Sequence, residues 1–133
     1  MNTQANRIFL MSSSAAVLAL LGIGATFLPQ EILASSGTQA GGASAILVQL
    51  LGALYLSFAM VNWMGRTNLI GGIYSRPVAM GNTLHFAMGA LALLKSATSG
   101  APGAPQLALL GVYALFALAF FTILFSHPSP EAS

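Results

Sequence analysis

Four long runs of apolar residues constrain the fold of this chain more than any other feature of its sequence. They cover about residues 8–28, 44–64, 78–95 and 106–126, and polar or turn-rich segments separate them. A helix rises about 1.5 Å per residue, so the longer runs match a bilayer hydrocarbon core of roughly 30 Å. Each run is therefore predicted to form a transmembrane helix.

The scarcity of charge supports the same conclusion. Of the 133 residues, 56% are hydrophobic and 5% are charged, whereas a soluble globular domain carries roughly 25% charged residues. A water-facing surface cannot be built from so few charges, so the exterior must face lipid. We predict an all-α fold, an integral membrane four-helix bundle that forms a single transmembrane domain over residues 1–133, with a flexible C-terminal tail over 127–133.

The first apolar run has a second interpretation as a secretory signal peptide, because Arg7 would end a basic leading region. The apolar part of a signal peptide is only about 7 to 15 residues long. This run is longer and ends at Pro29, so it is predicted to stay in the protein as a membrane span.

The connections are predicted from their Ser, Gly, Asn and Pro content, which is typical of turns and loops. Residues 30–43 are expected to be a polar connection without an element of its own. Residues 67–81 and 96–105 are expected to be turn-bearing loops.

The four basic residues indicate the orientation, because cytoplasmic loops are enriched in Lys and Arg. With four spans and a cytoplasmic N-terminus, Arg7, Arg66 and Arg76 lie inside and Lys95 lies at the outer edge. Both termini are therefore predicted to be cytoplasmic. Four scattered basic residues do not form the clustered surface that binds nucleic acid, so no nucleic-acid partner is predicted.

Small side chains follow helical spacing on the first run, and they are Ser12, Ala15, Ala16, Ala19 and Gly22. Small residues allow helix backbones to approach closely in lipid, where packing drives association. This face is predicted to be a packing seam within the chain, and the alternative is a face for dimerisation.

Polar and small side chains share one stripe of the second run, namely Gln49, Gly52, Tyr55, Ala59, Asn62 and Arg66. Unpaired polar groups are costly in hydrocarbon. Gln49 and Asn62 are therefore predicted to form hydrogen bonds to other helices. The corresponding face of the third run is predicted to contain Asn82, His85, Gly89, Ala92 and Ser96.

An ionisable side chain inside a membrane span is by default a candidate functional residue, and His85 is the only histidine within an apolar run. The predicted topology gathers a basic, hydrogen-bonding pocket around it at the cytoplasmic side. Its candidate ligand-binding residues are Asn62, Trp63, Arg66, Arg76, Asn82 and His85. Such a pocket suits an anionic head group or a polar small molecule. The alternative is a structural, neutral His85 that bonds a loop carbonyl.

The chain lacks the residues that several kinds of chemistry require. The chain has no Cys and no Asp, and its carboxylates, Glu31 and Glu131, lie outside the apolar runs. Ion-coupled transporters and many intramembrane hydrolases depend on buried carboxylates. We therefore predict no catalytic residue, no metal site and no cofactor. Haem held between His85 and His127 is the one cofactor alternative.

Two segments resemble the second and third helices of the DoxX-like proteins and of related, uncharacterised four-span families of small bacterial membrane proteins. They are Leu51 to Leu56 continuing through Asn62-Trp63-Met64, and Ser75-Arg76-Pro77 followed by Gly81-Asn82. The resemblance implies a four-helix bundle in the bacterial inner membrane and transfers no catalytic residue. The missing carboxylates set this chain apart from sterol isomerase-like four-span enzymes.

The leading functional hypothesis is a non-enzymatic multi-pass membrane protein that acts by interaction. It would serve as an accessory subunit of a larger membrane complex or as a homo-oligomer, with the lipid bilayer as its surroundings. The alternative hypothesis is a binding module for a lipid or small amphiphile in the pocket around His85.

Overall fold

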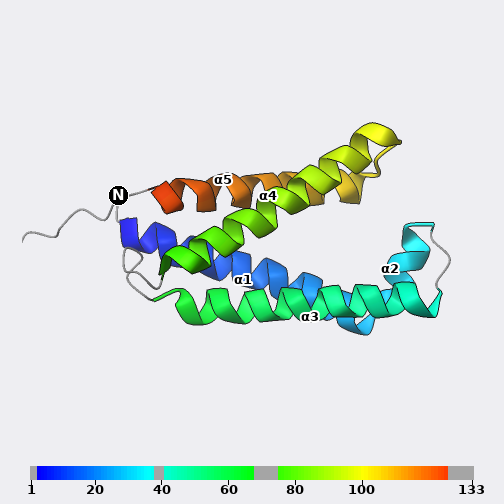
Figure 1. The fold of residues 1–133 in the computed structure, drawn as a ribbon, viewed down its shortest axis with the longest axis horizontal. Coiled ribbons are helices and arrows are strands. Elements are labelled where there is room, and N and C mark those ends of the chain that lie inside the picture. The colour runs from blue at the N-terminus through cyan, green and yellow to red at the C-terminus, as the bar shows by residue number, and fades with distance from the viewer. Residues whose placement is uncertain (1–2, 38–40, 68–74, 126–133) are drawn as a thin grey trace, which may run out of the picture. The chain divides into compact units, whose positions relative to one another are not determined.

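A computed structural model describes residues 3–37, 41–67 and 75–125, and all regular structure in these ranges is α-helical. The predicted all-α fold class is confirmed. The helices are α1 (Thr3–Phe27), α2 (Pro29–Ser35), α3 (Gly42–Gly65), α4 (Ser75–Ser99) and α5 (Ala104–Phe125) (Figure 1). Among the described residues, α1, α3, α4 and α5 are long and apolar enough to cross a membrane. The chain is thus a multi-pass membrane protein.

Helix α2 corrects the prediction that residues 30–43 contain no element. Pro29 occupies its first turn, where the missing N–H of proline would have no helical partner anyway. Pro29 and Leu33 are buried one turn apart, so the segment has an apolar face. Gly37 follows the helix with φ 71°, a left-handed conformation that ends helices and favours glycine. The predicted connection therefore begins with a short helix.

The other two loops are shorter than predicted. Helix α4 begins at Ser75, so residues 75–81 of the expected loop 67–81 are helical. Pro77 is tolerated there because the first N–H groups of a helix have no partner within it. Helix α4 continues to Ser99 and α5 begins at Ala104, so the expected loop 96–105 reduces to residues 100–103. In both places, residues that favour turns, such as Ser and Pro, lie in the first or last turn of a helix and not in the loop.

The chain divides into two compact units, Met1–Thr67 and Asn68–Ser133. Unit 1 contains α1, α2 and α3, and unit 2 contains α4 and α5. The single transmembrane domain over residues 1–133 stays a prediction. Each unit is a helical hairpin with its own packed seam.

In unit 1, α1 and α3 run antiparallel and their backbones almost touch at two glycines (Figure 1). A Cβ atom on Gly52 would lie 2.9 Å from the carbonyl oxygen of Gly22 and 2.7 Å from the backbone nitrogen of Thr26. Such a Cβ would also overlap the hydroxyl of Thr26. Only glycine fits this position, because any side chain would push the helices apart.

The face of α1 that is buried differs in part from the predicted one. Ala15 and Gly22 are buried as expected, but Ala16 is exposed, and Met11 and Leu18 are buried instead. Small size alone therefore does not define the seam. Both large side chains precede Gly22 on α1, and they fill the seam between the glycine contact and the end where Met11 lies against Gly65, as dense packing requires.

In unit 2, aromatic side chains form the seam between α4 and α5. Phe86 of α4 packs edge-on against Tyr113, with ring centroids 5.2 Å apart, and stacks on Phe116 at 4.9 Å. Its ring is also nearly parallel to that of Phe120. Gly89 makes room for Tyr113, because a Cβ atom at Gly89 would overlap the tyrosine ring. Edge-to-face and offset contacts of this kind stabilise aromatic pairs beyond their buried area.

We predict that Gly52→Leu and Gly89→Leu each lower the free energy of unfolding by about 1–3 kcal/mol or more, because both overpack a helix contact. Gly24 and Gly111 are matched controls, since a Cβ atom at either would meet no atom within 4 Å. Gly24→Leu and Gly111→Leu should leave stability unchanged or raise it, as leucine is the better helix former. Thermal unfolding in detergent measures the difference. Equal stability of all four variants would show that Gly52 and Gly89 do not lie at helix contacts.

Candidate functional site

The six predicted site residues divide equally between the two units. Asn62, Trp63 and Arg66 belong to the C-terminal end of α3 in unit 1. The other three, Arg76, Asn82 and His85, belong to the first half of α4 in unit 2. One pocket containing all six stays a prediction.

Asn62 is fully buried and holds α3 to α1. Its side-chain Nδ2 donates a hydrogen bond to the hydroxyl of Ser14 over 3.0 Å, and Ser14 Oγ donates to the carbonyl of Met11 over 3.0 Å. At the other end of the seam, Gln49 Nε2 donates to the carbonyl of Thr26 over 3.3 Å. The prediction that Gln49 and Asn62 form hydrogen bonds to another helix is confirmed. Both bonds join the two helices of unit 1.

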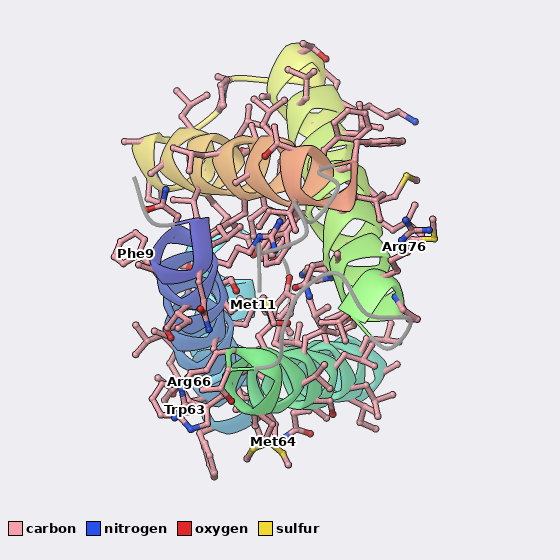
Figure 2. All side chains as sticks on the ribbon, turned by 90° about the vertical axis from the view of Figure 1, so that its left-hand side faces the viewer. Phe9, Met11, Trp63, Met64, Arg66 and Arg76 are labelled. Carbon is pink, nitrogen blue, oxygen red and sulfur yellow. The ribbon has the colours of Figure 1, made fainter. Side chains whose placement is uncertain are left out.

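Trp63 and Arg66 form a stacked pair at the C-terminal end of α3. The Arg66 guanidinium carbon lies 3.7 Å from the Trp63 ring centroid, and the Nη1 group donates a hydrogen bond to the Trp63 carbonyl. Figure 2 shows the two side chains together at this helix end. The cation over the ring is a favourable cation–π arrangement, and the hydrogen bond satisfies a carbonyl of the last helical turn. About half of the Trp63 surface is exposed.

The three candidates on α4 have different surroundings. Arg76 is exposed near the start of the helix. Asn82 is buried, and its Nδ2 donates to the carbonyl of Val78 in its own helix over 2.9 Å. His85 is partly buried, with its ring 5.7 Å from that of Tyr113 and 5.1 Å from that of Phe86. His85 is thus part of the aromatic seam of unit 2.

The predicted polar face of α4 is only half correct. Asn82 is buried and Gly89 contacts α5, as expected for a packing face. Ala92 and Ser96, however, are exposed. The large ring of Phe86 occupies the centre of the seam, so its bulk, and not the small residues further along, determines which face α4 turns to α5.

Ser14 and Tyr113 are among the contact residues that the sequence did not single out. Ser14 is one of three consecutive serines, and the pattern of small residues on α1 selected Ser12 in its place. Ser14 lies about one turn from Met11 and Leu18, but only the structure shows that these two are buried, so residue type alone did not distinguish Ser14 from its neighbours. Tyr113 was missed because no polar stripe marks α5. Its hydroxyl inside an apolar run was the only hint.

The arrangement offers hydrogen-bond donors, cations and one imidazole. Among the described residues, no group of three or more His, Cys, Asp or Glu side chains is placed to hold a metal ion. His127, the second histidine of the haem alternative, lies outside the described residues. Comparisons with protein-family models, with curated proteins and with solved structures find no match. The resemblance to DoxX-like proteins stays a prediction.

We predict that the Asn62–Ser14 hydrogen bond contributes about 0.6 kcal/mol, and at most about 1.7 kcal/mol, as measured for interhelical hydrogen bonds in membranes. A double-mutant cycle of Asn62→Ala and Ser14→Ala, followed by unfolding in detergent, gives the coupling energy. Ser13→Ala is the matched control, because the Ser13 hydroxyl bonds Leu10 of its own helix. Coupling of Asn62 to Ser13 equal to its coupling to Ser14 would contradict the assignment.

Proposed function

We propose that this chain is a non-enzymatic membrane protein that acts by interaction within the bilayer, as a homo-oligomer or as an accessory subunit of a larger membrane complex. The observation that carries the proposal is the division of α3 into two faces. Gly52, Ala59 and Asn62 are buried in the seam, whereas the remaining surface of the helix is largely uncovered. Because the long helices contain most of the described residues, a partner would be bound mainly through such helix faces.

The exposed face of α3 consists of large apolar side chains. Leu47, Leu50 and Leu54 lie three or four residues apart, and each exposes more than half of its surface. Lipid covers such a face adequately, and a second helix covers it with the added dispersion energy of close packing. Gln49 and Asn62 meanwhile bond α1, and the hydroxyl of Ser57, on the exposed side, bonds the carbonyl of Ala53 in its own helix, so these side chains do not oppose association.

The surroundings of His85 favour a role in packing over catalysis. General acid–base catalysis needs a group within hydrogen-bonding reach of a substrate. The imidazole of His85 lies against the rings of Tyr113 and Phe86. We therefore infer that the chain is not an enzyme.

We further propose the bacterial inner membrane as location, with both termini in the cytoplasm. The support for the orientation is the grouping of basic residues within unit 1. Met11 lies against Gly65, so Arg7, one turn before Met11, is at the same end of the hairpin as Arg66. Basic residues at one end favour a cytoplasmic position for that end. The resemblance to DoxX-like proteins supports the bacterial inner membrane.

Fusions to alkaline phosphatase, which is active only after export, test this orientation. Fused to the C-terminus of the full chain, the enzyme is expected to be inactive. Fused after Gly37, at the other end of unit 1, it is expected to be active. The reverse pattern would show that Arg7 and Arg66 lie outside.

The molecular mass in mild detergent tests the interaction. One chain has a mass of 13.6 kDa. A homo-oligomer gives a multiple of this mass, and an accessory subunit brings a second polypeptide in fixed ratio. The chain has no Cys, so Ser99→Cys provides a single labelling site for energy transfer between copies in vesicles. A monomer without a second polypeptide, together with no energy transfer above that of randomly mixed copies, would contradict the proposal.

A further inference from the structure

One end of unit 1 is positively charged. Among the described residues of this unit, the charged side chains are Arg7, Glu31 and Arg66. Arg7 and Arg66 lie at the end where α1 starts and α3 finishes, and Glu31 lies on α2 at the opposite end (Figure 1). The described part of the basic end thus contains two cations and no carboxylate.

The Arg66 guanidinium is held in a fixed orientation at this end. Stacking on Trp63 sets its plane, and the hydrogen bond to the Trp63 carbonyl uses one of its five N–H donors. The edge of a guanidinium matches two oxygens of a phosphate, and a preorganised group loses less side-chain entropy on binding. Arg66 is therefore suited to bind phosphate with its other donors.

Apolar surface begins directly beside the guanidinium. Trp63 is 51% exposed, Met64 is 70% exposed, and Met60, one turn earlier on the Trp63 side of α3, is 58% exposed. Arg66 itself follows Gly65, the last residue of the span Gly42–Gly65, and so is at the depth of the lipid head groups. A ligand that uses both features has an anionic head and an apolar tail.

We propose that Arg66 and Trp63 form a binding site for the phosphate of an anionic phospholipid, with its acyl chains along Trp63 and Met60. The Arg66 cation favours an anionic head group over a zwitterionic one, because the ammonium of a zwitterionic lipid finds no carboxylate among the described residues at this end. The site lies within unit 1. It depends neither on the proposed oligomer nor on the residues of unit 2.

The tryptophan of the site is its own reporter, because Trp63 is the only tryptophan in the chain. Bromine atoms on lipid acyl chains quench tryptophan fluorescence on contact. In vesicles of phosphatidylcholine with a small fraction of brominated lipid, brominated phosphatidylglycerol should quench Trp63 more strongly than brominated phosphatidylcholine does. We expect a three- to tenfold preference for phosphatidylglycerol over phosphatidylcholine. This is about the effect on affinity of one charge-assisted hydrogen bond that is weakened by exposure to water.

Three variants make the test specific. Arg66→Gln should abolish the preference, and Arg66→Lys should retain only part of it, because lysine keeps the charge but not the planar pair of donors. Lys95→Gln, on α4, removes the same charge from an exposed position and should leave the preference intact. Helicity and thermal unfolding of all variants show that the fold is kept.

Two results would overturn the proposal. One is equal quenching by the two brominated lipids in the parent protein, or an undiminished preference in Arg66→Gln. The other is a response of Trp63 emission in detergent to inorganic phosphate as strong as to phosphatidylglycerol, which would identify a site for small anions without a lipid component.

Discussion

The contact between the backbones of α1 and α3 at Gly22 and Gly52 sets the geometry of unit 1. Lipid offers no hydrophobic force between helices, so the helices are held by dispersion and by hydrogen bonds, both of which require close approach. The two glycines allow that approach, and the hydrogen bonds from Gln49 and Asn62 lie on either side of it. The same contact has a cost, since the buried hydroxyl of Thr26 has no hydrogen-bond partner among the described residues.

In unit 2, the two helices pack against each other mainly through large side chains. Phe86 inserts between Tyr113, Phe116 and Phe120, and a glycine appears only where the tyrosine ring needs space. Rings bury more area per residue than small side chains do, so a few aromatic side chains fill this seam. His85 lies in this seam, where its imidazole packs near the rings of Phe86 and Tyr113.

The geometry of unit 1 also positions the candidate lipid site. Because α1 and α3 are antiparallel, the N-terminal arginine and the arginine that follows α3 come to the same end of the hairpin. Asn62 faces the seam, whereas Trp63, the next residue, points to the outside. One helical end therefore combines a buried structural amide with an exposed aromatic and cationic pair. These two functions of neighbouring residues follow from the helical rotation of about 100° per residue.

The sequence by itself determined the fold class and the helical spans, because apolar runs of bilayer length leave the backbone no alternative to helix. It also indicated that Gln49 and Asn62 bond another helix, since a polar group in lipid needs a partner. It did not identify the partners Ser14 and Thr26, the seam position of Phe86, or helix α2. Those depend on how side chains of different size fit between two particular helices, and small residues or turn formers are compatible with several such fits. The stacking of Arg66 on Trp63 was likewise decided by the structure, because side chains three residues apart on a helix can stack but need not do so.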